Sequence, residues 1–96
     1  MPAKISVSEK EEITTGWVFE VAISEQGSET VHTVTLSKTD YERLTEGKAS
    51  AESLIERSFE FLLQREPKES ILRRFDLTKI GFYFPEYERE IRRRLG

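Results

Sequence analysis

The segment Ser50 to Glu66, read SAESLIERSFEFLLQRE, constrains the fold of this chain more than any other stretch. Its apolar residues fall on one side of a helix and its charged residues on the other, which is the pattern of an amphipathic helix. Ser50 is placed to accept a hydrogen bond from a free amide at the helix start, and Pro67 disfavours helical geometry in the residue before it. We therefore predict a helix that packs its apolar face on a second element. That face consists of Leu54, Ile55, Ser58, Phe59 and Leu62.

Two segments of alternating apolar and polar residues precede this helix and predict the element on which it packs. Residues 17–23 place large apolar side chains at every other position, and residues 30–36 alternate in the same way. The intervening SEQGSE, residues 24–29, is short, polar and contains glycine. The economical interpretation is a β-hairpin.

The first twelve residues are expected to form a flexible N-terminal arm. Only Ile5 and Val7 alternate there as a strand requires, and an edge strand through these two residues is the alternative. Residues 13–96 are then expected to form one domain, because a chain of 96 residues can bury only a modest core.

Further helices are predicted on both sides of the amphipathic segment. Ser37 and Asp40 resemble a capping box at the start of a short helix, and Gly47 is placed to end it. Pro67 suits the first position of another helix. The apolar residues expected to point inward from that helix are Ile71, Leu72 and Phe75. Gly81 and Pro85 interrupt the last helical pattern, which favours two pieces that meet near Pro85.

These elements predict an α+β fold in a single small domain: an antiparallel β-hairpin followed by three or four helices packed on its apolar face. The core then combines the apolar face of the hairpin with the inner faces of the helices. The expected core residues are Trp17, Phe19, Val21, Ile23, Val34, Leu36, Leu44, Leu54, Ile55, Phe59, Leu62, Ile71, Phe75, Leu77 and Ile80.

The composition favours a soluble, cytoplasmic protein. The sequence contains no cysteine, so disulfides and thiolate metal sites are excluded. No stretch reaches the apolar length of a membrane span, so we expect no membrane attachment. The net charge of −3 gives no overall attraction to nucleic acid or anionic lipid.

No catalytic constellation is found in the sequence. His32 is the sole histidine and lies inside a predicted strand, without a second histidine or a cysteine to complete a metal site or a nucleophilic relay. Gly-rich phosphate loops and nucleophile turns are absent. We therefore expect a protein that is not an enzyme, has no cofactor and binds no metal.

The C-terminal third holds the candidate partner-binding residues. Exposed aromatic clusters anchor protein interfaces, whereas the same side chains can instead cover the core of a small domain. The aromatic candidates are Phe82, Tyr83, Phe84 and Tyr87. Arg73 and Arg74 are the basic candidates, although interleaved acidic residues cancel much of their charge. We predict a non-enzymatic protein-interaction or regulatory module whose partner is another protein, and leave open whether it is a monomer or a dimer.

Residues 31–66 resemble a ribbon-helix-helix DNA-binding unit, in which an alternating strand precedes a short and then a longer helix. The resemblance implies that strands of two subunits pair and enter the major groove, while the second helix touches phosphate. Carried over, it places Val31, Thr33 and Thr35 at the bases and Lys48 and Ser50 at the backbone. This dimeric DNA-binding regulator or antitoxin is the alternative function. The strand lacks Arg, Lys, Asn and Gln, the side chains suited to bidentate base contacts.

A second resemblance covers most of the chain. The segments LSKTDYERL, SFEFLLQREPKESILRRFDL and YFPEYEREI resemble a family of small uncharacterised bacterial proteins. This resemblance implies no activity, ligand or catalytic residue.

Overall fold

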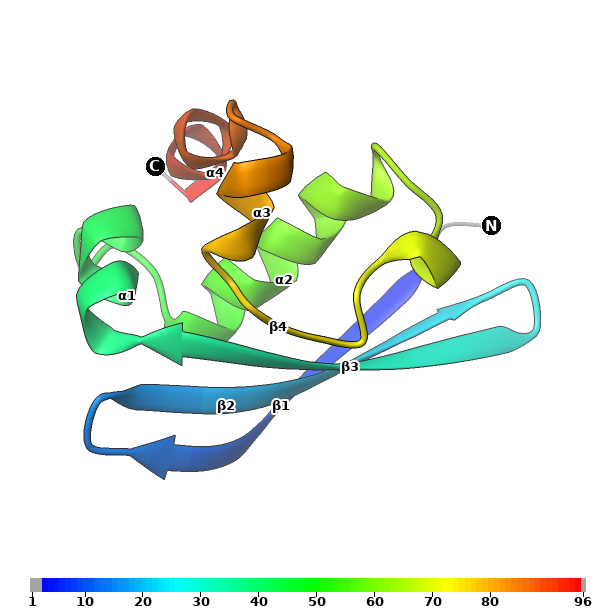
Figure 1. Ribbon diagram of the computed structural model, residues 1–96, viewed down its shortest axis with the longest axis horizontal. Coiled ribbons are helices and arrows are strands. Elements are labelled where there is room, and N and C mark those ends of the chain that lie inside the picture. The colour runs from blue at the N-terminus through cyan, green and yellow to red at the C-terminus, as the bar shows by residue number, and fades with distance from the viewer. Residues whose placement is uncertain (1–2, 96) are drawn as a thin grey trace.

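A four-stranded sheet in the order β1-β2-β3-β4 forms the base of the protein, and the helices lie on one of its faces (Figure 1). The structure is a computed structural model and describes residues 3–95. The strands are Lys4–Ile13 (β1), Gly16–Glu25 (β2), Ser28–Ser37 (β3) and Arg74–Asp76 (β4). β1, β2 and β3 pair antiparallel, whereas β4 runs parallel to β3. The α+β class is confirmed, but the sheet is mixed and larger than the predicted antiparallel hairpin.

The helical layer consists of α1 (Lys38–Thr45), α2 (Ala51–Leu63), α3 (Lys79–Tyr83) and α4 (Tyr87–Leu95). Helix α2 lies above the sheet, and α4 lies on the far side of α2 from it (Figure 1). Ser37 caps α1 and Ser50 caps α2, each by accepting a hydrogen bond from a backbone amide three residues later. The apolar face predicted for α2 is buried in the core.

Tight turns join the long strands. The β2–β3 turn consists of Gln26 and Gly27, whose φ angles of 53° and 80° suit the twist of a two-residue hairpin. The hairpin is therefore confirmed, with a shorter loop than predicted. Gly16 begins β2 where the chain passes close to β3, and a Cβ atom there would lie 2.1 Å from the carbonyl oxygen of Leu36.

The N-terminal segment, for which we expected a flexible arm over residues 1–12, contains strand β1. Its register with β2 places Ile5 opposite Ile23 and Val7 opposite Val21, with an irregularity between Glu9 and Glu11. Ile5 and Val7 are half-buried against the core, so the alternative of an edge strand describes this segment. Residues 1–2 lie outside the described part.

The core lies between the sheet and the helices. All but one of the predicted core residues are buried; Trp17 is only partly covered and packs edge-on against Tyr41, with ring centroids 5.4 Å apart. Phe61, Tyr87 and Ile91 are also buried. They join the core because α4 covers a second side of α2, which single-helix periodicity does not reveal.

The segment after Pro67 departs from the predicted helix. It forms one 3₁₀ turn, η1 (Lys68–Ser70), and then the short strand β4. Strand β4 forms because β3 offers free backbone groups at this edge: the amide of Thr33 donates to the Arg73 carbonyl oxygen and Thr35 accepts from Leu77. Phe75 points into the core as expected, whereas Leu72 is exposed. Within residues 3–95, no helix is long and apolar enough to cross a bilayer.

Candidate functional site

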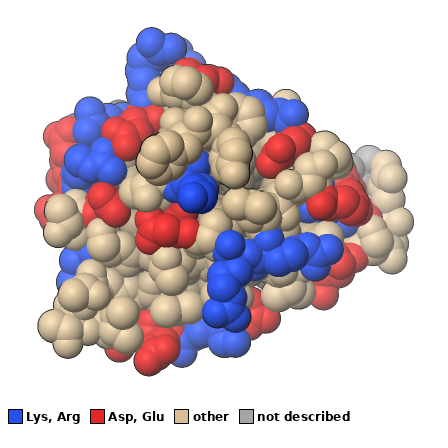
Figure 2. Space-filling view, in the orientation of Figure 1, with Lys and Arg blue, Asp and Glu red and all other residues tan. Residues whose placement is uncertain are grey.

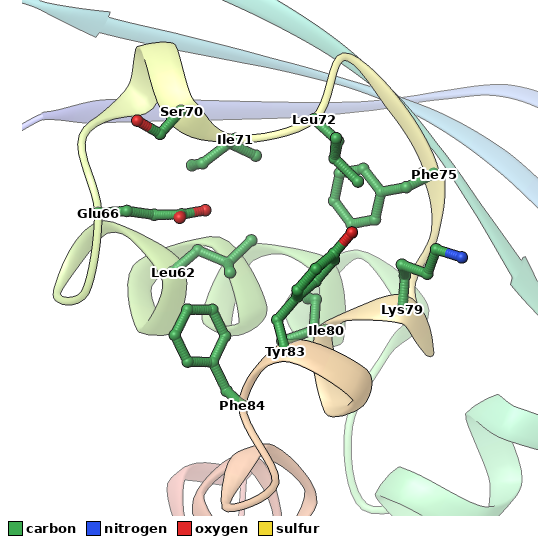
Figure 3. Close-up of a pocket in the computed structure, with 10 residues that line it drawn as sticks. All are labelled: Leu62, Glu66, Ser70, Ile71, Leu72, Phe75, Lys79, Ile80, Tyr83 and Phe84. Carbon is green, nitrogen blue, oxygen red and sulfur yellow. The ribbon is translucent and has the colours of Figure 1, made fainter.

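A groove opens between the end of α2, the η1–β4 segment and α3, with a volume of about 410 Å³ (Figure 3). We call it the apolar groove. Its walls are the side chains of Leu62, Ile71, Leu72, Phe75, Ile80 and Phe84. A space of this size, lined mainly by apolar groups, lies within the range of ligand-binding pockets in proteins.

Four polar side chains complete the lining of the apolar groove: Glu66, Ser70, Lys79 and Tyr83. None of them makes a side-chain hydrogen bond or ion pair with another residue in the range 3–95. Figure 3 shows the carboxylate of Glu66 directed into the groove from one side, with Tyr83 in the middle. Lys79 lies on the opposite side, with its amino group directed outward from the groove. The groove thus combines an apolar interior with an acceptor that points into one end and a cation on the outer rim of the other.

Large apolar side chains are exposed at the groove and beside it. Leu72 is 44% exposed and Tyr83 is 62% exposed, and both line the groove. Phe82, next to Tyr83 in α3, is 80% exposed, and the Lys79 amino group lies 5.6 Å from the centre of its ring. Figure 2 shows uncharged surface in the part of the view that α3 occupies, with acidic and basic groups interspersed around it.

A hydrogen bond from His32 joins the groove wall that carries Leu72 to the sheet. The carbonyl oxygen of Leu72 lies 2.7 Å from Nδ1 of His32, and Thr30 Oγ1 lies 2.9 Å from Nε2. A carbonyl only accepts, so Nδ1–H donates to Leu72 and Nε2 accepts from the hydroxyl of Thr30. Burial lowers the pKa of His32, and the nearby charge of Arg73 lowers it further, against the opposing effect of the Leu72 hydrogen bond. His32 therefore has a structural role.

The aromatic residues predicted as a partner-binding patch divide between the surface and the core. Phe82 and Tyr83 are exposed, whereas Phe84 is half-buried and packs edge-on against Phe61, with ring centroids 5.9 Å apart. Tyr87 is fully buried, and its hydroxyl lies 2.7 Å from that of Ser58. The site is therefore formed by Tyr83 and Phe84 with residues of α2 and the η1–β4 segment, and Tyr87 belongs to the core.

The predicted basic residues flank the groove wall. Arg73 and Arg74 are exposed and lie in the chain between Leu72 and Phe75, which both line the groove. Neither guanidinium makes an ion pair with a described residue. Both side chains are free to meet a partner at this edge.

The residues of the DNA-binding alternative are exposed or half-buried, but β4 occupies part of the β3 edge that this mode needs. Val31, Thr33 and Thr35 alternate with the buried positions of β3, and Thr35 donates a hydrogen bond to Asp76. Lys48 is exposed in the turn after α1, and the Ser50 hydroxyl is used to cap α2. Because β2 and β4 flank β3, pairing of β3 with its copy is blocked at residues 33–35.

Sequence reasoning missed the residues that give the groove its polar rim. Glu66 and Ser70 were not singled out, and Leu72 was assigned to the interior. A signal was present: Glu66 lies four residues after the buried Leu62, just beyond the end of α2, and its amide donates to the Leu62 carbonyl oxygen, so its side chain lies near the edge of the buried face. The η1–β4 segment forms the opposite wall, and no periodic pattern in the sequence indicates where it lies.

No group of three potential metal ligands occurs within residues 3–95. Comparisons of the chain with protein-family models, with curated proteins and with solved structures found no match.

Proposed function

We propose that this protein is a non-enzymatic interaction module that receives an apolar segment of a partner protein in the apolar groove. The observation that carries the proposal is the exposure of Leu72 and Tyr83 at the mouth of a preformed apolar pocket. Exposed apolar side chains that adjoin a concave site mark interaction surfaces more often than isolated ones do.

The physical case is the surface that binding would remove from water. Leu72, Phe82 and Tyr83 expose large apolar areas in the free protein. Complete burial of one such side chain contributes about 1.5–3 kcal/mol. Two or three anchors of this kind, with the apolar interior of the groove, offset the entropy lost on association and give binding in the range of peptide recognition.

A protein segment is favoured over a small molecule because the exposed apolar surface continues past the groove. Phe82 does not line the groove, yet it is the most exposed of the large apolar residues described. A ligand confined to about 410 Å³ would leave Phe82 in water, whereas a peptide chain crossing the mouth would cover it. Arg73 and Arg74 border the same edge and offer donors to a partner.

The test is selection of peptides from a random display library on the purified full chain. We expect enriched peptides with large apolar residues, and loss of their binding to Leu72→Ser and to Tyr83→Ala. The matched control is Val31→Ser, because Val31 is 40% exposed but lies on β3 rather than at the groove. Equal binding to Leu72→Ser and to the wild type, or equal loss in Val31→Ser, contradicts the proposal.

Truncation is not a suitable test for this region. Removal of the chain after Pro67 would delete core residues as well as the groove wall, so loss of binding would report unfolding. The buried hydrophobic residues lost would be Ile71, Phe75, Leu77, Ile80, Tyr87 and Ile91. Single substitutions of exposed side chains avoid this problem, and circular dichroism confirms that each variant remains folded.

A further inference from the structure

We propose that the segment bound in the apolar groove carries a basic residue beside its apolar anchor, on the Glu66 side, and an acidic residue on the Lys79 side. This inference rests on the proposed function and specifies the chemistry of the partner. It is drawn from the charge arrangement of the groove rim, in which an anion and a cation lie on opposite sides (Figure 3).

Glu66 is the stronger determinant. Its side chain is half-buried and directed into the groove, and its carboxylate makes no ion pair or hydrogen bond with another described residue. An ionised carboxylate only accepts hydrogen bonds. A segment that covers it with apolar or acidic groups therefore removes the water that donates to it and supplies no donor in its place. A lysine or arginine of the partner restores both the charge balance and the hydrogen bonds.

Lys79 provides the opposite requirement. Its ammonium group has three donors and a flexible stem, and among the described residues it makes no hydrogen bond or ion pair, only a contact with the ring of Phe82. Arg73 and Arg74, in the adjoining chain between Leu72 and Phe75, add positive charge at this wall. An acidic residue of the partner is attracted there, whereas a basic one is repelled. The Tyr83 hydroxyl, between the two charges, can pair with the partner backbone (Figure 3).

The test is the same display selection carried out on charge-reversed variants. On the wild type we expect enrichment of peptides with a basic residue at one end of the apolar anchor and an acidic residue at the other. On Glu66→Lys the basic preference should change to an acidic one, and on Lys79→Glu the acidic preference should change to a basic one. The control Glu42→Lys alters net charge as much as Glu66→Lys does but lies in α1, so its selected peptides should match those of the wild type.

A double-mutant cycle with one selected peptide measures the coupling between its basic residue and Glu66. Exchange of its basic residue for glutamate should weaken binding to the wild type by roughly tenfold or more, and Glu66→Lys should restore much of that loss. Peptides that bind through Leu72 and Tyr83 but keep the same charge preference on Glu66→Lys overturn the charge inference and leave the interaction module intact. A library that yields no groove-dependent peptide overturns the proposed function itself.

Discussion

His32 and Leu72 are separated by 40 positions in the sequence, yet Nδ1 of His32 lies 2.7 Å from the carbonyl oxygen of Leu72. The imidazole is fully buried in β3 beside the ring of Phe59, with ring centroids 5.6 Å apart, while the Leu72 side chain lies at the mouth of the apolar groove. One side chain therefore connects the core of the sheet to the wall of the candidate site.

The stability of the protein should fall as the pH drops below about 6.5, the ordinary pKa of histidine. The pKa of His32 is lowered in the folded state, chiefly by burial, so the unfolded chain binds more protons in this range. Stability then rises with pH, is present above the unfolded pKa, and is lost as the pH falls from there toward the folded pKa. Urea unfolding at pH 7.5 and at pH 5.5 measures the difference before most carboxylates titrate.

His32→Gln is the control for this pH dependence. The variant removes the titrating group and should be less stable than the wild type at pH 7.5 by about 1–3 kcal/mol, the cost of disturbing a buried hydrogen-bonded group. Its stability should change less between pH 7.5 and 5.5 than that of the wild type. An equal change in both proteins would show that another group causes the pH effect.

Gly16→Ala should destabilise the protein, because a Cβ atom at this position would lie 2.1 Å from the Leu36 carbonyl oxygen and 2.8 Å from Cα of Ser37. Both neighbours are backbone atoms, so the β2–β3 register must distort, at a cost of about 1–3 kcal/mol or more. Gly81→Ala, in α3, meets nothing within 4 Å and should instead stabilise by about 0.5–1 kcal/mol. Chemical denaturation of both variants measures whether the free energy of unfolding falls for Gly16→Ala and rises for Gly81→Ala.

Phe59→Ala and Phe82→Ala should differ strongly in stability although they delete the same side chain. Phe59 is fully buried between the rings of His32 and Phe75, so its removal leaves a cavity and should cost about 3–5 kcal/mol. Phe82 is 80% exposed, and its removal should change the free energy of unfolding by less than about 0.5 kcal/mol. A large loss for Phe82→Ala would show that this ring is covered, for example by a second copy.

The parts of the fold that were predicted correctly carry a complete local signal. The α2 segment has its own cap, its own apolar face and a proline after its end, and the hairpin has alternation with a Gly-containing turn. Strand β1 and strand β4 lack such signals. β1 is polar over most of its length because it is an edge strand with an open outer side, and β4 exists because β3 presents free backbone groups to it.

The candidate site was predicted only in part for a similar reason. Tyr83 and Phe84 were identified by residue type, but the groove depends on where the η1–β4 segment passes relative to α2. That path is fixed by hydrogen bonds from His32 and Thr33 of β3, which lie far from this segment in the sequence. Phe61 was not assigned to the core because α4, which covers it, packs on α2 through contacts that no single-helix pattern contains.

The contact that fixes α4 on α2 predicts an asymmetric pair of substitutions. The Ser58 hydroxyl donates to the Leu54 carbonyl oxygen at 2.7 Å, so the Tyr87 hydroxyl, 2.7 Å from Ser58 Oγ, must donate to it. Tyr87→Phe removes one donor and leaves Ser58 bonded to Leu54, which should cost about 1 kcal/mol. Ser58→Ala leaves the phenol buried without its acceptor and should cost more, about 1–3 kcal/mol.

The double variant Ser58→Ala with Tyr87→Phe distinguishes the contribution of the Tyr87–Ser58 hydrogen bond from that of packing alone. Because it removes both polar groups, it should be less destabilised than the sum of the two single variants, with a coupling energy of about 0.5–3 kcal/mol. Strictly additive costs in the cycle would contradict the direct hydrogen bond between α2 and α4.

Burial raises the pKa of Tyr87, so the phenol stays protonated when an exposed tyrosine ionises, and the wild type should lose stability as the pH rises above about 10. Tyr87→Phe should lose less stability over that range.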